Sequence, residues 1–443
     1  MEIGSIIFIL IFLGSATFFG IKVKQIIDNI KLGKSLDRSD NKGERMKTMI
    51  RVALGQSKMV TRPIAGILHI FIYVAFVITQ VELIEIIIDG ATGNHRIFSE
   101  PLGGFYTFVI SLIEVLSLLA LIATFSFLAR RNLLKIPRFV KSEMTGWPKL
   151  DGNIILYLEF LLVICIFTMN GADEALRLRG ESHAAGSGSF GFAISSFTGD
   201  AIFGGMETGT LHLLERIGWW GHFAVVMAFL CYLPFSKHLH ILWAFPNVYF
   251  SNLNPKGQFT NMEAVTNEVK LMLDPNADPF AAPPADENAE PQKFGAKDVT
   301  DLTWVNIMNA YTCTECGRCT SSCPANITGK KLSPRKIMMD VRDRAEEVGK
   351  GLRKNKDFND GKSLLGDYIT EEEVWACTSC NACVQECPVN IDPLSIIVDL
   401  RRYLVMEESK IPAELMTMNT NIENNQAPWQ FSPSDRLNWK DED

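Results

Sequence analysis

Long apolar runs alternate with short polar segments through the first 250 residues of the chain. Five of these runs have spanning length, because a helix needs roughly 20 apolar residues to cross the ~30 Å hydrocarbon core of a bilayer. They cover residues 3–21, 64–88, 105–128, 152–169 and 217–243. The first run lacks a basic segment before it and a convincing cleavage site, so we interpret it as a span and not as a signal peptide.

The polar segments between the runs differ in charge. Residues 22–62 contain eleven Lys and Arg against four acids, and residues 129–149 contain six against one. The alternate connections, 89–104 and 170–216, contain only four Lys and Arg between them. Since positively charged loops stay on the cytoplasmic side, we expect the N-terminus outside and everything from about residue 244 onward in the cytoplasm.

The pattern changes after residue 250, where polar and charged positions dominate. A stretch rich in Pro, Ala and acids at 274–300 is typical of a linker. Helical patterns follow over 334–354, from 370–373 and over 394–406, so the predicted fold class is mainly α. We predict a five-helix transmembrane bundle followed by an α-helical two-cluster ferredoxin domain. The expected division is a membrane domain at 1–250, a linker at 251–300, a ferredoxin domain at 301–410 and a tail at 411–443. The loop 171–216 is expected to form a partly ordered cap with a short helix near 209–218.

Charge separates the two halves of the chain. Residues 1–250 carry 22 Lys and Arg against 19 Asp and Glu, whereas residues 251–443 carry 21 against 31. The soluble half is therefore acidic, and this disfavours a nucleic-acid partner.

The clearest chemical signal is a cysteine motif that occurs twice. Residues 313–324 and 377–388 both read C-x2-C-x2-C-x3-C-P, the spacing that binds cubane clusters in bacterial two-cluster ferredoxins. Eight of the ten cysteines lie in these motifs inside a long chain, which indicates a reducing compartment and no disulfide scaffold. The remaining Cys165 and Cys231 lie in apolar runs, as small buried side chains do. The 53 residues between the motifs include helical patterns, which favours an α-helical ferredoxin over the small β-containing type.

The spacing also predicts which cysteines share a cluster. Three thiolates two residues apart can bind three corners of one cube, and the fourth cysteine, before proline, ligates the other cluster. The predicted ligand sets are Cys313, Cys316, Cys319 and Cys387 for one cluster, and Cys377, Cys380, Cys383 and Cys323 for the other. Paired C-x2-C segments can also bind structural zinc. Four cysteines with a terminal proline, present twice, favour two [4Fe-4S] clusters.

Three histidines lie within or at the ends of the spans, where an imidazole is a functional hypothesis by default. Haem b needs two axial histidines at one depth on facing helices. His69 lies near the cytoplasmic start of the second span, level with His240 on the fifth, so these are the candidate haem ligands. On a continuous helix His222 and His240 would share one face about 27 Å apart, and His238 would point the other way. Satisfied polar contacts are the alternative.

A second haem would need His222 to find a partner among the outer-loop residues His95, His183 and His212. Otherwise His222 would serve quinone protonation together with acidic residues near it. Carboxylates inside spans often relay protons. The candidate quinone or proton residues are Glu82, Glu85, Glu114 and His222, and Glu159 is a further intramembrane carboxylate.

The membrane half resembles the gamma subunit of respiratory nitrate reductase, which has five spans and bis-histidine haem b. That family carries a histidine pair with the same 18-residue separation on span five and another pair on span two. Here span two has only His69, and Thr79 stands ten residues further on. The resemblance therefore implies one haem b and leaves the second without its ligands.

The segments 219–222, 234–240 and 254–257, with 313–334 and 375–402, are similar to a more specific group. These are the membrane iron–sulfur oxidoreductases related to heterodisulfide reductase, including the bacterial electron-transfer-flavoprotein:menaquinone type. The resemblance covers nearly the whole chain and implies a bacterial inner-membrane protein that uses menaquinone. Longer members continue with cysteine-rich CCG domains, whereas no cysteine follows Cys387 here. It therefore implies an incomplete oxidoreductase subunit whose partner is a separate cytoplasmic CCG-domain subunit, an electron-transfer flavoprotein, or both.

These observations predict a membrane-anchored electron-transfer subunit. It would pass electrons between a cytoplasmic redox partner and the menaquinone pool through two [4Fe-4S] clusters and haem b. One alternative is a quinol-oxidising subunit that drives reduction of a disulfide or sulfur compound by its partner. An alternative of another class is a non-redox membrane scaffold with structural clusters.

Overall fold

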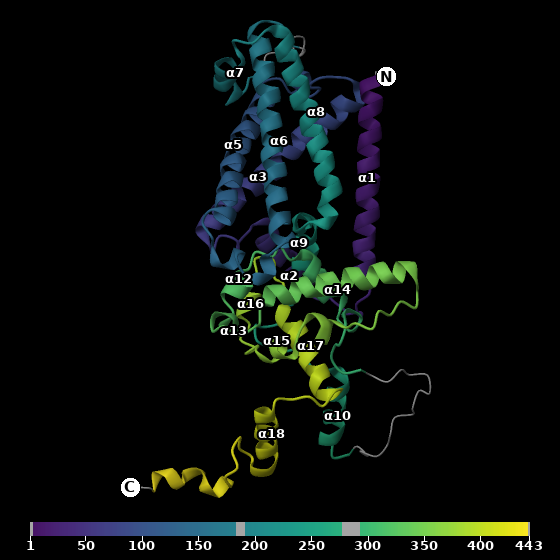
Figure 1. Cartoon of the computed structure of the whole chain (residues 1–443), viewed down its shortest axis with the longest axis vertical. Helices are drawn as coiled ribbons and strands as arrows, with labels where there is room; N and C mark the ends of the chain where they lie inside the picture. Colours follow the sequence, from purple (N-terminus) through teal and green to yellow (C-terminus); the bar gives the residue numbers. More distant parts are fainter. Residues whose placement is uncertain (1–2, 183–190, 277–292, 442–443) are drawn as a thin grey trace.

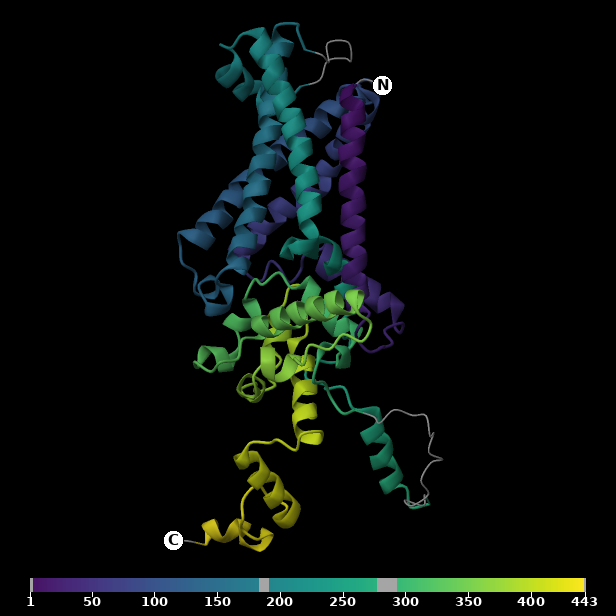
Figure 2. The same ribbon diagram turned by 45° about the vertical axis from the view of Figure 1, so that its right-hand side comes forward.

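Five long helices stand side by side and meet a second helical domain at one end of their bundle (Figures 1 and 2). The structure is a computed structural model, and it describes residues 3–182, 191–276 and 293–441. We call residues 293–410 the cysteine domain, its contact with the bundle the junction, and the opposite end of the bundle the far end. The first described residues of the chain lie at the far end. The predicted fold class is confirmed, and the described residues contain no β-strand.

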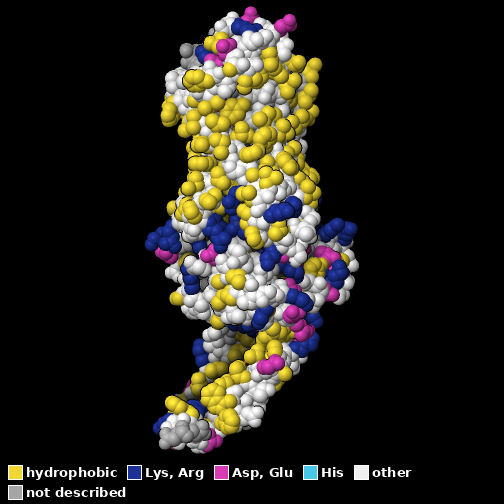
Figure 3. Space-filling model, turned by 60° about the vertical axis from the view of Figure 1, so that its left-hand side comes forward, with side chains coloured by type: hydrophobic (Ala, Val, Ile, Leu, Met, Phe, Trp, Pro, Cys, Tyr) yellow, Lys and Arg dark blue, Asp and Glu magenta, His cyan; other side chains and the backbone are white. Residues whose placement is uncertain are grey.

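The five bundle helices are long and apolar enough to cross a membrane. They are α1 (Ile3–Ile30), α3 (Pro63–Thr92), α5 (Gly104–Asn132), α6 (Trp147–Leu178) and α8 (Thr208–Tyr232). Large apolar side chains such as Phe105, Phe108 and Phe125 are exposed on the outside of the bundle. Figure 3 shows them as a broad hydrophobic belt, with Lys and Arg gathered where the bundle meets the cysteine domain. An apolar surface of this extent is stable only against lipid. The chain is a membrane protein.

Polar residues extend α6 beyond its apolar run and into the segment that was expected to be loop. The last turns of α6 contain Asn170 and Asp173, both fully buried. Arg96, in the connection after α3, donates to both of them, with Nη2 2.8 Å from Asn170 Oδ1 and Nε 3.2 Å from Asp173 Oδ2. Since these buried polar groups are satisfied, the helix can continue through them. The short helices α4 (Ser99–Leu102) and α7 (Ser195–Phe203) complete the far end.

The short helix expected near 209–218 is the first part of α8, which is the fifth span. The expectation of one continuous helix through residue 243 is wrong. After Tyr232 the chain makes two 3₁₀ turns, Leu233–Phe235 and Lys237–Leu239, and α9 (His240–Tyr249) then begins. Pro234 has no N–H to donate to the helix. Asp151 of α6 fixes the break by accepting from Ser236 Oγ at 2.6 Å and from the Lys237 backbone N–H at 3.1 Å.

The cysteine domain is built from short helices around one long helix. The long helix α14 (Pro334–Lys354) begins after Ser333, whose hydroxyl caps it, and its bounds are those predicted. Thr370 and Glu373 form a capping box at the start of α15, as the sequence indicated. The other helices are α11 (Trp304–Thr312), α12 (Arg318–Ser321), α13 (Pro324–Ile327), α15 (Glu371–Trp375), α16 (Ala382–Glu386) and α17 (Pro393–Met406). Outside this domain lie α2 (Lys42–Met49), α10 (Glu263–Leu273) and α18 (Ala413–Asn425).

The bundle and the cysteine domain share one hydrophobic core. Ile26 and Ile30, at the end of α1, are buried in the same cluster of apolar side chains as the interior of the cysteine domain. Between them, Asn29 donates from Nδ2 to the Tyr311 hydroxyl at 2.8 Å and accepts from Arg353 Nη1 at 2.6 Å. The cysteine domain is therefore packed directly on the bundle and is more than a tethered module.

Candidate redox centres

The two cysteine motifs fold alike, because the same positions of each adopt a left-handed backbone. Two residues after the first cysteine stand Glu315 (φ 55°) and Ser379 (φ 54°), and four residues after it stand Gly317 (φ 72°) and Asn381 (φ 63°). This conformation turns backbone N–H groups toward the sulfur atoms. The Ser379 N–H donates to Cys377 Sγ at 3.4 Å, and the Glu315 N–H serves Cys313 in the same way. Such N–H donors stabilise thiolate ligands of a cluster.

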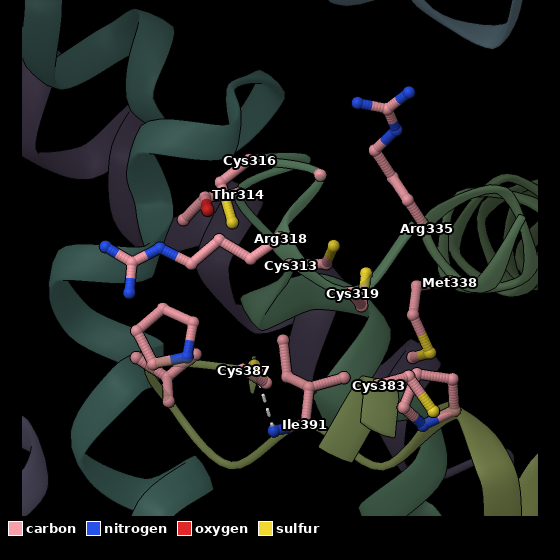
Figure 4. Close-up of a pocket in the computed structure, with 14 residues that line it drawn as sticks. Cys313, Thr314, Cys316, Arg318, Cys319, Arg335, Met338, Cys383, Cys387 and Ile391 are labelled. Atoms are coloured by element: carbon pink, nitrogen blue, oxygen red, sulfur yellow. Dashed lines mark hydrogen bonds between the residues drawn. The ribbon is translucent and has the colours of Figure 1, made fainter. Parts of the chain in front are cut away.

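Four cysteines from the two motifs meet in one pocket. Cys313, Cys316 and Cys319 of the first motif lie along one side, and Cys387 of the second motif lies across from them (Figure 4). The pocket contains about 410 Å³ of space outside protein atoms. Cys387 Sγ accepts a hydrogen bond from the Ile391 N–H at 3.3 Å. The four side chains gathered here are those that the spacing assigned to one cluster.

The other four cysteines are also neighbours of one another. The charge of Cys323 acts on both Cys377 and Cys383, and Cys380 acts on Cys377. Cys380 is exposed, whereas Cys383 is buried and also lines the first pocket. The second set therefore reaches from the first pocket to the surface of the domain.

Burial and crowding make these thiols hard to ionise without a metal. Burial, with the neighbouring Cys316 and Cys387, raises the pKa of Cys313 to about 12, although the Glu315 N–H lowers it. Burial, with Cys316, likewise raises the pKa of Cys387 to about 11. The pKa of Cys319 rises well above its ordinary value for the same reasons, with burial as the largest cause. Only bound cationic metal can hold such a group as thiolates, and its binding releases their protons.

The arrangement suits a cube better than a single ion. A tetrahedral zinc site holds four sulfur atoms about 2.3 Å from one metal. Among the described residues, no three His, Cys, Asp or Glu side chains lie close enough to hold one metal ion. The eight thiolates therefore fit two polynuclear clusters, for which the sulfur atoms must stand apart around a larger body.

Basic residues of the bundle loops surround the first pocket. Lys58, in the loop before α3, acts on Cys387 and binds Asn390 Oδ1 at 2.9 Å. Arg318, between two cysteines of the first motif, donates from Nη1 to the Lys58 carbonyl at 3.0 Å and from Nη2 to the Met59 carbonyl at 3.1 Å. The loop that leads into α3 is thus attached to the first motif.

His69 and His240 face one another directly above that motif. Their ring centres are 6.4 Å apart, with an angle of 46° between the rings. An axial nitrogen lies about 2 Å from a metal and the ring centre about 1 Å further, so two axial imidazoles on one iron are centred roughly 6 Å apart. His240 Nδ1 lies 3.1 Å from the Lys237 carbonyl oxygen, which as its acceptor leaves Nε2 to bind metal. His69 Nδ1 is buried and has no hydrogen-bond partner among the described residues. The pair fits axial ligation of haem.

His238 does not point away from His240, as a continuous helix would require. The two rings are 5.5 Å apart and nearly perpendicular, and His238 also packs against Phe229 with ring centres 5.0 Å apart. The 3₁₀ turn over Lys237–Leu239 brings them together. The sequence could have signalled this change of phase only through Pro234.

The candidate proton residues at the far end divide into satisfied and unsatisfied groups. Glu85 accepts from the Tyr106 hydroxyl at 2.8 Å and from the Phe98 N–H at 2.9 Å. Glu114 accepts from Asn170 Nδ2 at 3.2 Å and from the Ser195 hydroxyl. These two carboxylates therefore have structural partners.

Glu82 differs from both of them. It is 3% exposed, and neither of its carboxyl oxygens has a hydrogen-bond partner among the described residues. It lies within the electrostatic range of Arg96, Glu85 and Glu114. His222 is buried on α8 and takes no part in the hydrogen bonds of Glu85 or Glu114 described above. The structure therefore groups Glu82 with Glu85 and Glu114 and leaves His222 apart.

Several further candidates have simpler environments. Glu159 accepts from the Thr124 hydroxyl at 3.3 Å, and Thr79 bonds the Phe76 carbonyl of its own helix. His95 contacts Arg216 at 3.2 Å. His183 lies outside the described residues.

The chain is a membrane electron-transfer protein that binds [4Fe-4S] clusters. The family model for the 4Fe-4S dicluster domain matches residues 312–391, which include both motifs. The chain is 28% identical to the "Probable iron-sulfur-binding oxidoreductase FadF" of Bacillus subtilis, over 99% of this chain and 61% of that protein. It is 26% identical to the EtfAB:quinone oxidoreductase of Syntrophomonas wolfei, over 92% of this chain and 55% of that protein.

A third relative matches the soluble part. It belongs to the ferredoxin/F(420)H(2)-dependent CoB-CoM heterodisulfide reductase of Methanosarcina acetivorans, and it is 33% identical over 26% of this chain and 60% of its own length. No solved structure is significantly similar to the chain. The chain is thus related to membrane iron–sulfur oxidoreductases and to heterodisulfide reductase, and it spans about three fifths of the length of the first two relatives.

The purified protein should contain about eight non-haem irons per chain. Cys387→Ser should damage the cluster otherwise held by Cys313, Cys316 and Cys319, because its side chain completes their pocket. Iron analysis and electron paramagnetic resonance of the reduced protein measure both effects. Cys231→Ser is the matched control and should keep full iron. Loss of only the second motif's cluster in Cys387→Ser would show that the ligand sets are wrong.

Proposed function

We propose that the chain carries electrons between a cytoplasmic redox protein and menaquinone in a bacterial inner membrane. The observation that carries this proposal is the position of the His69–His240 pair directly beside the first cysteine motif. Two [4Fe-4S] clusters and one haem b, held by the residues named above, would supply one-electron transfer. The loop charges support a cytoplasmic cysteine domain and an N-terminus outside.

Exposure of the ligands supports an order for the centres. Cys380 of the second set is exposed, Cys383 joins the two sets, and the first pocket adjoins the bundle. Electrons would therefore enter near Cys380, pass to the first set and leave toward His69 and His240. A relative named EtfAB:quinone oxidoreductase favours flow toward quinone.

Quinone chemistry also needs protons, and Glu82 is the residue we assign to it. A buried carboxyl group without hydrogen-bond partners is costly, and within a membrane span it is by default functional. Glu85 and Glu114 would hold the surrounding loops, since their oxygens are already bonded. The neighbouring Arg96 would stabilise Glu82 when it is ionised.

The partner would be an electron-transfer flavoprotein or a heterodisulfide-reductase-like protein. The relatives carry these names, and single-electron centres need another protein to divide the electron pairs of metabolic donors. The soluble half carries 31 Asp and Glu against 21 Lys and Arg, so a basic docking surface would be attracted to it.

The haem assignment is tested by optical spectra of the dithionite-reduced protein. We expect b-type bands from one haem per chain, and His69→Ala or His240→Ala should abolish the low-spin signal because each removes an axial nitrogen. His95→Ala serves as a control outside the pair and should retain the bands. A wild-type protein without haem would refute this part of the proposal, and two haems would mean that His222 has a ligand partner.

Glu82→Gln should slow menaquinone-linked turnover on the order of 100-fold, the usual contribution of a positioned acid or base. Reduction of the clusters should be unchanged, because Glu82 lies on the far side of the His69–His240 pair. Stopped-flow reduction and steady-state turnover in proteoliposomes separate the two effects. Glu100→Gln, an exposed residue at the same end, is the control. Equal turnover in Glu82→Gln and the control would remove Glu82 from the proposal.

Docking of the partner should weaken with salt. Rising ionic strength screens exposed charges, so the rate of cluster reduction by electron-transfer flavoprotein should fall between about 0.05 and 0.5 M salt. The measurement is cluster bleaching after mixing, together with a mild-detergent pull-down at each salt concentration. If the chain alone reduced menaquinone with a small-molecule substrate, no partner would be required and this account would fail.

A further inference from the structure

Lys237 is a buried cation at the junction. Only 9% of this residue is exposed. Its ammonium binds the Glu315 carboxylate and donates to the Pro148 carbonyl at 2.7 Å, with Asp151 Oδ2 at 3.7 Å. Burial of an ion pair carries a desolvation penalty, and replacing such a pair by apolar residues is often neutral or stabilising. Stability alone therefore does not explain these charges.

The backbone of the same residue holds the His240 ring. The Lys237 carbonyl lies 3.1 Å from His240 Nδ1, and the Lys237 N–H donates to Asp151 at 3.1 Å. Lys237 is thus fixed at its backbone and at its side chain. Any movement of its side chain toward or away from the cysteine domain would pass to the carbonyl that orients His240.

Glu315, at the other end of the ion pair, belongs to the first cysteine motif. It stands between Cys313 and Cys316, and its N–H serves the Cys313 sulfur. Its second carboxyl oxygen accepts from Arg342 Nη1 at 2.9 Å. At the corresponding place in the second motif Ser379 has the same backbone conformation and no carboxylate. The loop conformation therefore does not need the Glu315 side chain.

We propose that Lys237 and Glu315 are positioning residues that hold the His240 ring and the first cysteine loop in fixed relation to one another. The connection is continuous: Cys313 sulfur, Glu315 backbone, Glu315 carboxylate, Lys237 ammonium, Lys237 carbonyl, His240 ring. It fixes the separation and relative orientation of the two centres, on which electron transfer depends. This inference rests on the proposed haem and first-cluster ligands.

The experiment compares purified full-length variants that retain both centres. Lys237→Met removes the ammonium, Glu315→Gln removes the charge without changing shape, and Lys237→Arg restores a cation. Lys297→Met, in an exposed ion pair with Glu408 elsewhere in the cysteine domain, is the matched control. Iron and haem contents are measured first. The readouts are the g-values of the low-spin haem and the rate of haem reduction after rapid reduction of the clusters.

We expect Lys237→Met to shift the haem g-values and to slow haem reduction at least tenfold, since a misplacement of about 1 Å can lower a geometry-dependent rate on the order of 100-fold. Lys237→Arg should recover most of the rate. Glu315→Gln should give the same changes, and the double variant should be no worse than either single one, because both remove one connection.

The two possible failures are distinct. Absence of haem or of clusters in the wild-type protein would refute the proposed function itself. Normal contents in all variants, with g-values and rates like those of Lys297→Met, would refute only the positioning role. If Lys237→Met does not fold, Glu315→Gln and Lys237→Arg still decide the question, because both keep the buried volume nearly unchanged.

Discussion

Eight cysteine side chains occupy the cysteine domain, where ionised sulfur is poorly solvated and neighbouring thiolates repel one another. The burial that raises the pKa of Cys313 and Cys387 also means that these groups need positive charge to exist as ligands. The pocket that contains the first three cysteines of one motif is closed by the last cysteine of the other. The helices between and after the motifs must therefore bring two distant loops together before either pocket is complete.

The same principle of satisfied charge governs the junction. Loop carbonyls that would otherwise lack donors receive them from arginines of the cysteine domain: Arg318 binds the loop before α3, and Arg335 donates to the Arg138 carbonyl at 2.6 Å between α5 and α6. Arg335 is fully buried and pairs with Glu143 at 2.7 Å. Loss of one partner of such a pair leaves a buried charge, which costs about 3–5 kcal/mol. The bundle loops and the cysteine motifs thereby form one rigid assembly.

Much of this arrangement could be predicted from local sequence, because local physical rules determine it. The apolar runs gave the number of spans, and Ser333 followed by Pro334 set the start of α14 to the residue. The structure also groups the cysteines as their spacing predicted. What the sequence could not provide depended on partners distant in the chain. Asn170 and Asp173 extend α6 because Arg96 meets them, and Asp151 fixes the break after Tyr232 that places His238 beside His240.

The end of α1 contributes Ile26, Asn29 and Ile30 to the interior of a domain that begins more than 260 residues later. During synthesis these side chains emerge early, and the surfaces that cover them emerge last. The cysteine domain consequently cannot complete its core until the first helix has been inserted in the membrane and the final motif has left the ribosome. Membrane insertion and metal incorporation are thus ordered in time, and a chain whose first helix fails to insert presents an unfinished core to the proteases that remove defective proteins.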